Sequence, residues 1–215
     1  MPGRVQAKIC GVSTPEAVRA ALDGGAEYLG LVFFPASPRA VRIADAARLA
    51  EPVRGRAKIV ALTVDPDDAL LEEIRAGLDP DFIQLHGKES PARVREVAGR
   101  AGAGVIKALP VAEAADLDAA AAYEGVADHL MFDAKPPKTS DRPGGHGSSF
   151  DWSLLTGRRF SRPWFLAGGL DPWNVADAVR LSGAPIADVS TGVERGPGLK
   201  DPALIAAFLD AVRKL

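Results

Sequence analysis

Short apolar segments rich in Val, Ile, Leu and Phe recur along the whole chain of 215 residues. Most of them are followed by a longer, alanine-rich stretch whose apolar residues have helical spacing. This alternation predicts parallel strands joined by helical crossovers, because neighbouring parallel strands need a long connection. The predicted strands are residues 5–10, 27–33, 57–64, 81–86, 104–110, 128–133, 163–169 and 186–190.

The predicted crossovers carry helix start signals. Thr14-Pro15 and Asp171-Pro172 each place a capping residue before a proline that suits the first turn of a helix. Eight strand–helix units in a chain of this length predict an α/β fold, a (β/α)8 TIM barrel that forms a single domain over residues 1–215. An open flavodoxin-like sheet, with two of the strands misread, is the alternative.

Composition narrows the classes of function. With 26 basic and 28 acidic residues the formal net charge is −2, so there is no electrostatic basis for a nucleic-acid partner or an anionic membrane surface. No apolar run approaches the roughly 18 residues of a membrane span, and the chain starts without the apolar region of a secretion signal. Cys10 is the only cysteine, so no intramolecular disulfide can form. We expect a cytoplasmic protein that acts on a small molecule.

One predicted connection is much longer than the others. Residues 134–149, AKPPKTSDRPGGHGSS, follow the sixth predicted strand and are rich in Pro, Gly, Ser and Lys. Loops longer than about 12 residues are often lids or binding loops, and in a barrel a loop that follows a strand lies on the catalytic face. We therefore favour a functional loop over a disordered surface insertion.

Cys10 ends the first predicted strand, and Lys8 precedes it by two residues. Because residues two apart on a strand share a face, Lys8 lies one layer below Cys10 if the thiol points to the barrel mouth. The ammonium group of Lys8 would then favour the Cys10 thiolate, a candidate catalytic group. A buried thiol that acts as a small hydrophobic side chain is the other interpretation, and the residues alone leave the two about even.

Asp133 ends the sixth predicted strand, after the apolar run Leu130-Met131-Phe132. A partly desolvated carboxyl group retains its proton more readily, so such a group can act as a general acid near neutrality. An aspartate that only hydrogen-bonds loop amides would have the same sequence signature. The sequence alone favours neither interpretation.

Glycine-rich segments after the strands predict a phosphate site. Backbone amides can approach an anion closely there, and barrels often bind phosphate between the loops after strands seven and eight, at a short extra helix. Glycines needed only for tight turns are the alternative. The candidate phosphate-binding residues are Gly145 and Gly147 in the long loop, Gly168 and Gly169 after the seventh strand, and Ser190, Thr191 and Gly192 after the eighth.

Three more polar side chains are candidates for contact with a ligand. Arg39 ends the rigid, proline-containing segment 33–39, and its planar guanidinium suits a carboxylate or a phosphate. A solvated surface arginine is the alternative. Gln84 and His86 lie two apart at the end of the fourth predicted strand, so both could face the mouth and contact substrate. A histidine satisfied within the core or at the rim is equally expected.

Two other functions stay open on the residues alone. Lys107 lies within the fifth predicted strand, where a buried amine could form a Schiff base as in an aldolase, or could instead pair with a carboxylate. A non-catalytic barrel that binds a phosphosugar is the second rival. His86, His129 and His146 are the only histidines and lack metal-ligand spacing, so we expect no metal site.

An ordered set of motifs resembles the phosphoribosylanthranilate isomerase family over essentially the whole chain, and the set is highly specific. The motifs are KICG at 8–11, FFPASPR at 33–39, QLHG at 84–87, FDA at 132–134, GGHGSSFDW at 144–152, LAGGL at 166–170 and DVSTGVERGPGLKD at 188–201. Two places depart from the family pattern. Ser148-Ser149 stand where many members have Lys-Thr, and the third strand runs into Asp65 where the family more often has asparagine.

The resemblance implies an activity. The chain would convert N-(5-phosphoribosyl)anthranilate to 1-(2-carboxyphenylamino)-1-deoxyribulose 5-phosphate in tryptophan biosynthesis, as an aldose–ketose isomerase that needs no redox cofactor or metal. It implies that Cys10 is the general base and Asp133 the general acid of this Amadori rearrangement. Arg39 would bind the anthranilate carboxylate, the glycine loops the phosphate, and Asp188 would lie near the substrate. Whether the chain is a monomer or a homodimer is left open.

Overall fold

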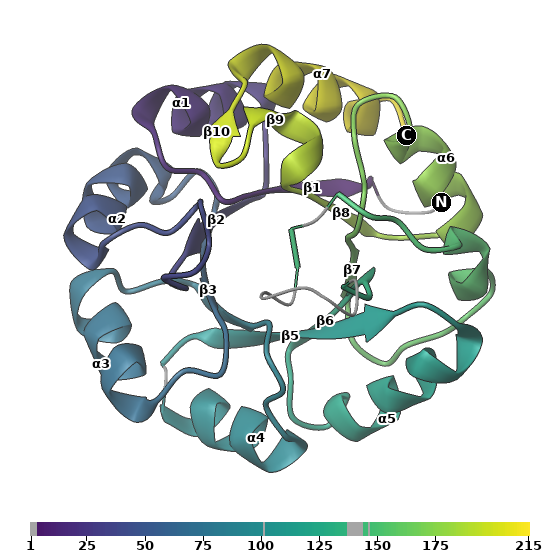
Figure 1. The fold of residues 1–215 in the computed structure, drawn as a ribbon, viewed down its shortest axis with the longest axis horizontal. Helices are drawn as coiled ribbons and strands as arrows, with labels where there is room; N and C mark the ends of the chain where they lie inside the picture. Colours follow the sequence, from purple (N-terminus) through teal and green to yellow (C-terminus); the bar gives the residue numbers. More distant parts are fainter. Residues whose placement is uncertain (1–3, 101, 137–143, 146) are drawn as a thin grey trace.

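Eight parallel strands close into a barrel in which each strand pairs with its neighbours in chain order and β1 pairs with β8 (Figure 1). The computed structural model describes residues 4–100, 102–136, 144–145 and 147–215. The barrel strands are β1 (Gln6–Cys10), β2 (Tyr28–Val32), β3 (Lys58–Thr63), β4 (Phe82–Leu85), β5 (Gly104–Val111), β6 (His129–Ala134), β7 (Trp164–Leu166) and β8 (Ile186–Val189). The predicted barrel is confirmed, and the open-sheet alternative is wrong because the β1–β8 ladder closes the sheet.

The strand bounds differ little from the predicted ones, except at β7. This strand ends at Leu166, whereas the sequence predicted residues 163–169. Gly168 and Gly169 have φ angles of +85° and +66°, which lie outside the extended region that a strand requires. The backbone therefore turns away from the barrel two residues after β7 and forms a loop at the mouth.

Helices cover the outside of the barrel (Figure 1). The crossover between β6 and β7 is the least helical, because its described residues contain only the short 3-10 helix η3. The α-helices are α1 (Pro15–Gly24), α2 (Ile43–Ala50), α3 (Asp68–Gly77), α4 (Pro91–Arg100), α5 (Ala120–Tyr123), α6 (Val175–Ser182) and α7 (Pro202–Arg213). The 3-10 helices are η1 (Glu51–Val53), η2 (Ala114–Ala119), η3 (Trp152–Leu155) and η4 (Thr191–Val193).

One of the two helix start signals has the predicted role and the other does not. Thr14 caps α1, and its side-chain oxygen accepts a hydrogen bond from the Ala17 N–H at 3.3 Å. The prediction for Asp171 is wrong, because α6 begins only at Val175, after Asn174. The Asp171 carboxylate instead accepts from the Asn174 N–H at 2.9 Å and closes a turn ahead of the helix.

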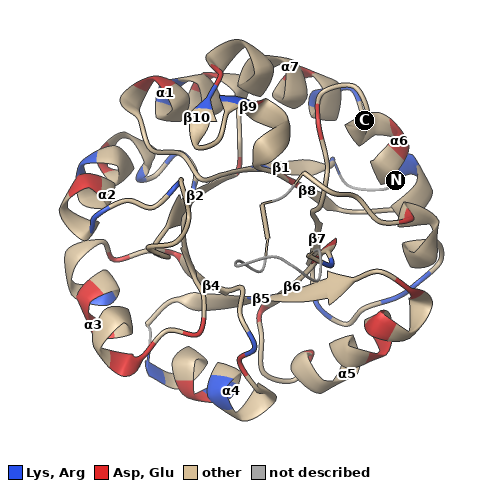
Figure 2. Cartoon of the chain, in the orientation of Figure 1, with Lys and Arg blue, Asp and Glu red and all other residues tan. Residues whose placement is uncertain are grey.

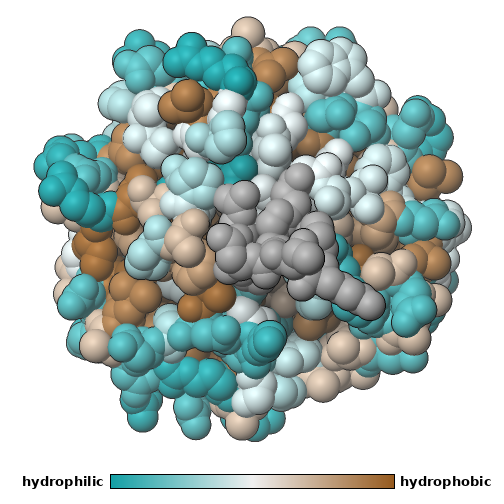
Figure 3. Space-filling model, in the orientation of Figure 1, coloured by the Kyte–Doolittle hydropathy of each residue, from teal (hydrophilic) through white to brown (hydrophobic). Residues whose placement is uncertain are grey.

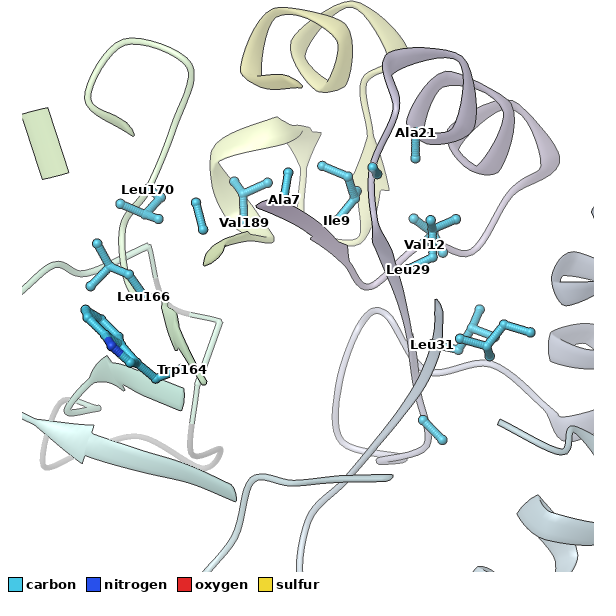
Figure 4. Packing of buried hydrophobic residues seen from close by; sticks show 14 of the residues in the cluster. Ala7, Ile9, Val12, Ala21, Leu29, Leu31, Trp164, Leu166, Leu170 and Val189 are labelled. Atoms are coloured by element: carbon cyan, nitrogen blue, oxygen red, sulfur yellow. The ribbon is translucent and has the colours of Figure 1, made fainter. Parts of the chain in front are cut away.

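Apolar side chains fill two regions, one between the strands and the helices and one inside the barrel. In the outer region Ile9, Leu29 and Val189 point from their strands toward the surrounding helices (Figure 4). The inner region contains residues from the opposite face of the strands, such as Tyr28 on β2 and Ile186 on β8. The interior is thus a packed core whose upper end, at the carboxyl ends of the strands, is left for polar groups.

An aromatic layer closes the opposite end of the barrel. Tyr28, Phe82 and His129 begin their strands, and Phe165 packs among them, with ring centroids 5.0 to 6.4 Å apart. Nδ1 of His129 is buried and has no hydrogen-bond partner among the described residues. Burial lowers the pKa of His129, although Asp128 acts in the opposite direction. This layer therefore favours a neutral imidazole.

A small hairpin that the sequence did not predict follows the barrel. Strands β9 (Glu194–Gly196) and β10 (Leu199–Lys200) pair antiparallel between η4 and α7. Charged residues elsewhere lie mainly on the outer helices and loops (Figure 2), and hydrophilic residues predominate around the face in view (Figure 3). Within the described ranges, no helix has the length and apolar character needed to span a membrane.

Candidate active site

A pocket lies at the mouth of the barrel, where the strands end and the following loops begin. All twelve residues that the sequence singled out as the acid–base pair or as substrate contacts line this pocket. They are Cys10, Arg39, His86, Asp133, Gly145, Gly147, Gly168, Gly169, Asp188, Ser190, Thr191 and Gly192. Of the predicted functional loop 134–149, residues 137–143 and 146 lie outside the described residues.

Cys10 ends β1 and has only 4% of its surface exposed. Its register partner on β2 is Gly30, where a Cβ atom would come within 2.9 Å of Sγ, so glycine leaves the space that the thiol needs. Lys8 lies below Cys10 on the same face of β1, where its charge acts on the thiol. Fully buried, Lys8 also donates to Oδ1 of Asp188 at 2.7 Å across the β1–β8 ladder. The predicted stacking of Lys8 under Cys10 is therefore confirmed.

The pKa of the Cys10 thiol is raised from its usual value. Burial is the largest cause, the Lys8 cation lowers the pKa, the Asp188 carboxylate raises it, and Lys200 lowers it again. Lys8 thus favours the thiolate, as predicted, but burial outweighs it and the net pKa is raised. For Lys8 itself burial lowers the pKa, yet Asp188 and Cys10 together raise it, so Lys8 stays a cation.

Asp133 lies on β6 with one oxygen engaged by the backbone and the other by a histidine. Oδ1 accepts from the Ala134 N–H at 2.8 Å, and Oδ2 lies 3.1 Å from Nε2 of His86. Nδ1 of His86 is in turn 2.8 Å from Nε2 of Gln84. Gln84 is fully buried, and its Oε1 has no hydrogen-bond partner among the described residues. Asp133 therefore binds the amide of the last residue of its own strand and also lines the pocket, and its role as a general acid stays a prediction.

Arg39 follows β2 and is only 5% exposed, so the solvated-arginine alternative is wrong. Its guanidinium pairs with Glu194 through Nε–Oε1 at 2.7 Å and Nη2–Oε2 at 2.9 Å, and Nη2 also donates to Thr191 at 3.1 Å. Glycines lie along the side chain. A Cβ at Gly11 would come within 2.5 Å of Cδ, and one at Gly145 within 2.6 Å of Nη1. The guanidinium is therefore fixed at the rim of the pocket.

Glu194 and Lys200 are functional candidates that sequence reasoning missed. Nζ of Lys200 is 2.7 Å from Oε1 of Glu194 and donates to the Ser190 carbonyl at 2.8 Å. Burial raises the pKa of Glu194, but Arg39 and Lys200 more than offset it, so the net pKa is lowered. For Lys200 burial dominates and lowers the pKa. Their place in the motif DVSTGVERGPGLKD was the available signal for them.

The loops after β7 and β8 present backbone to the pocket. Gly168 and Gly169 adopt left-handed φ angles that other residues rarely tolerate. A Cβ at Gly192 would collide with the Leu170 carbonyl, so the two loops pack backbone against backbone. The short helix η4 begins at Thr191, where the sequence predicted an extra helix beside a phosphate. This arrangement brings several main-chain amides to one side of the pocket.

Nearly the whole chain matches a known family. Residues 7–211 match the family described as PRAI: N-(5'phosphoribosyl)anthranilate (PRA) isomerase. A curated relative, the N-(5'-phosphoribosyl)anthranilate isomerase of Caulobacter vibrioides, is 66% identical over 209 residues, which cover 97% of this chain and 95% of the relative. The chain belongs to the phosphoribosylanthranilate isomerase family.

Solved structures of the phosphoribosylanthranilate isomerase family share this fold. The enzyme of Thermotoga maritima has a TM-score of 0.88 and 33% identity, with 98% of this chain and 100% of that chain covered. A structure described as a complex with reduced 1-(o-carboxyphenylamino)-1-deoxyribulose 5-phosphate has a TM-score of 0.85, 30% identity and the same coverage. A third, described as monomers generated from the dimeric Thermotoga maritima enzyme, has a TM-score of 0.83, 31% identity and again the same coverage.

Lys107, the candidate Schiff-base lysine, does not line the pocket of this phosphoribosylanthranilate isomerase family member. Its neighbours Ile106 and Ala108 pack inside the barrel, so Lys107 points outward, toward the helices. Nζ lies 2.7 Å from Oε2 of Glu89 and donates to the Gly87 carbonyl at 2.8 Å. The aldolase prediction is therefore wrong, and the alternative of a carboxylate partner is confirmed.

Proposed function

We propose that Cys10 is the general base and Asp133 the general acid with which this chain converts N-(5'-phosphoribosyl)anthranilate to 1-(2-carboxyphenylamino)-1-deoxyribulose 5-phosphate in tryptophan biosynthesis. One observation carries the assignment of roles. The thiol on β1 and the carboxyl group on β6 line the same pocket, so a substrate bound there has a candidate base and a candidate acid within one cavity.

The first chemical step opens the ribose ring. Asp133 donates its proton to the ring oxygen while the C1–O bond breaks, and the nitrogen lone pair forms the C=N bond of an iminium ion. Cys10 then removes the C2 proton. The C–H electron pair becomes the C1=C2 bond, and the electrons of the C=N bond return to nitrogen, which gives an enolamine.

Tautomerisation completes the reaction. The C2 hydroxyl loses its proton to the Asp133 carboxylate, and C1 receives the proton held by the Cys10 thiol, which leaves a ketone at C2. Atoms and electrons balance within the substrate, since C2 is oxidised and C1 reduced. The cycle restores both side chains, so the chemistry requires neither a redox cofactor nor a metal.

The raised pKa of Cys10 has a place in this sequence of steps. A thiol that retains its proton in the free protein is a poor base. The iminium ion formed in the first step carries a positive charge next to the thiol, and a nearby cation favours the thiolate. Lys8 adds a second, permanent cation below Cys10. The base is therefore most effective after the ring has opened.

The remaining pocket residues would hold the two anionic ends of the substrate. Arg39 would bind the anthranilate carboxylate, because a guanidinium presents planar N–H donors to a carboxylate. The glycine loops around Gly168 and Gly192 would bind the phosphate through main-chain amides. Asp188 and His86 also line the pocket, and they would contact the ribose. Anchoring both ends would bring the reacting carbons to the acid and the base.

A turnover assay on two variants tests the proposed roles. Conversion of N-(5-phosphoribosyl)anthranilate is followed as loss of anthranilate fluorescence, with circular dichroism as the control for folding. We expect Cys10→Ser and Asp133→Asn each to lower kcat by roughly a hundredfold or more, the usual contribution of a general acid or base. Full activity in either variant would refute the assignment of that residue. Phosphosugar binding by the wild-type chain without turnover would favour a non-catalytic barrel instead.

The domain organisation, cellular location and oligomeric state of the protein are also proposals. We propose that residues 1–215 form a single domain, which the match of residues 7–211 to one family supports. The lone cysteine supports a cytoplasmic location, because a chain with one thiol gains no intramolecular disulfide from an oxidising compartment. We further propose that the chain acts as a monomer or a homodimer, on a small phosphoribosyl substrate and without a nucleic-acid or membrane partner.

A further inference from the structure

Three charged side chains form a buried cluster behind the pocket, here called the ion cluster: Arg39, Glu194 and Lys200. Their side chains are 6%, 2% and 1% exposed. Glu194 accepts from both cations, with the contacts to Arg39 at 2.7 and 2.9 Å and the contact to Lys200 at 2.7 Å. A buried ion pair often adds no net stability, but the three short contacts to Glu194 restrict where the two basic groups can lie. The cluster is therefore a device that fixes positions.

The ion cluster joins two segments that are far apart in sequence. Arg39 lies in the loop between β2 and α2, whereas Glu194 and Lys200 belong to the β9–β10 hairpin. The hairpin turn closes directly on the loop, because a Cβ at Gly198 would collide with the Pro38 carbonyl. Oε2 of Glu194 also accepts from the Gly198 N–H at 3.3 Å. The hairpin thus holds the carboxylate at one place relative to the arginine.

The contacts of Arg39 divide its guanidinium into two sides. Nε and Nη2 face Glu194 and Thr191, while Nη1 lies on the side of Gly145. Arg39 lines the pocket, whereas Glu194 stands behind it and does not. Because a guanidinium is planar, fixing Nε and Nη2 also fixes the direction of the Nη1 donors. Glu194 therefore sets where Arg39 can receive a carboxylate from a ligand.

The second cation of the ion cluster keeps this side of the pocket attractive to an anion. Glu194 alone would neutralise Arg39. With Lys200 included, two cations share one carboxylate, and the buried cluster has a net positive charge. A substrate carboxylate would complete the charge balance at the position of Arg39.

We propose that Glu194 is a positioning residue that makes the enzyme selective for a substrate whose aromatic amine bears a carboxylate. It acts through Arg39, which it aligns, and not on the reacting atoms. The inference rests on the proposed function, in which Arg39 binds the anthranilate carboxylate. Glu194 would then determine how strongly the site distinguishes an anthranilate from an aniline.

The test compares two substrates in the full-length protein: N-(5-phosphoribosyl)anthranilate and the corresponding adduct of aniline, which lacks the carboxylate. The measured quantity is the ratio of the two kcat/KM values, with products quantified by chromatography. We expect Glu194→Gln to lower this ratio by about tenfold or more, the usual effect of losing a hydrogen bond to a charged group. The loss should appear as a higher KM for the anthranilate substrate, with inhibition by inorganic phosphate unchanged.

Glu89→Gln is the matched control. Glu89 is equally buried and pairs with Lys107 at 2.7 Å, but it does not line the pocket. Both substitutions remove a buried carboxylate from an ion pair, so a general effect on folding would act on both variants. We expect Glu89→Gln to retain the wild-type ratio, whatever its effect on stability.

A shorter carboxylate keeps the inference testable if Glu194→Gln does not fold. Glu194→Asp retains the charge of the ion cluster and draws the carboxylate back by one methylene, so it should lower the ratio by a smaller factor. If both variants fold, an unchanged ratio of the kcat/KM values in both would overturn the proposal. If Glu194→Gln does not fold, an unchanged ratio in Glu194→Asp alone would overturn it.

Arg39→Met separates this inference from the proposed function. If Arg39→Met lowers the ratio while the Glu194 variants do not, Arg39 binds the carboxylate without help from Glu194, and the positioning role alone is refuted. If Arg39→Met leaves the ratio unchanged, the carboxylate is bound elsewhere, and the role proposed for Arg39 is refuted with it.

Discussion

At the scale of single residues, the environment of Cys10 combines opposing effects. Burial and the Asp188 carboxylate raise the pKa of the thiol, while the cations of Lys8 and Lys200 lower it. Burial prevails, so the free protein holds a protonated thiol. This balance suits a base that must wait for a cationic intermediate, because a thiolate present throughout would be exposed to oxidation and alkylation.

Substitution of Lys8 tests this balance directly. In Lys8→Met the cation below the thiol is lost and Asp188 is left without its partner, and both changes raise the pKa of Cys10 further. The rate of alkylation by iodoacetamide should therefore reach its half-maximal value at a higher pH than in the wild type. The chain has a single cysteine, so the labelling is unambiguous. An unchanged midpoint in a folded variant would show that Lys8 does not act on the thiol.

At the residue scale, the sequence could predict that Cys10 and Asp133 lie at the same mouth of the barrel. Cys10 and Asp133 each end a predicted strand, and strand ends of a barrel meet at one mouth. Glu194 was missed because its importance lies in a contact with Arg39, which is 155 residues away in the chain. A glutamate in a polar segment has no local pattern that distinguishes a buried partner of an arginine from a solvated side chain.

At the scale of elements, the strands were predictable because their pattern is local. Each barrel strand is a short apolar run, and the structure places all eight within a few residues of the predicted bounds. The β9–β10 hairpin escaped prediction since its strands have only three and two residues, fewer than a periodic pattern needs. The outward direction of Lys107 was missed because alternation alone does not say which face of a strand is inside.

Backbone conformation explains one departure from the family pattern. Asp65, which follows β3 where asparagine is more common in the family, has a φ angle of +44°. Aspartate and asparagine are the residues besides glycine that tolerate this left-handed region best. Oδ1 of Asp65 also accepts from the Lys88 N–H at 2.7 Å. The substitution therefore conserves the turn between β3 and α3.

The aromatic layer at the amino ends of the strands makes the stability of the barrel dependent on pH. Burial lowers the pKa of His129 in the folded protein. As the pH falls through the ordinary histidine range, the unfolded chain therefore binds a proton at His129 more readily than the folded protein does. The free energy of unfolding should therefore decrease on acidification, from about pH 7.5 to about pH 5. In His129→Leu this decrease should be smaller. Urea unfolding of the wild type and His129→Leu at both pH values measures the change in the free energy of unfolding. An equal decrease in the two proteins would exclude His129 as the cause.

At the scale of the whole molecule, stability and chemistry lie at opposite ends of the barrel. Aromatic rings pack the amino ends of the strands, while the carboxyl ends carry the buried ion pair of Lys8 and Asp188 and the candidate acid and base. Closure of the barrel brings β1 and β6 to one mouth although Cys10 and Asp133 are far apart in sequence. The fold thereby allows each group to be placed by a separate strand.

The most direct test of the central claim is the kinetic isotope effect on kcat with substrate deuterated at C2 of the ribose, measured on the residual activity of the two variants. If Cys10 removes the C2 proton and Asp133 opens the ring, Cys10→Ser makes proton removal limiting, and its isotope effect should rise well above that of the wild type. Asp133→Asn makes ring opening limiting, and its isotope effect should approach unity. The reverse pattern, or equal effects in both variants, would contradict the assignment of base and acid.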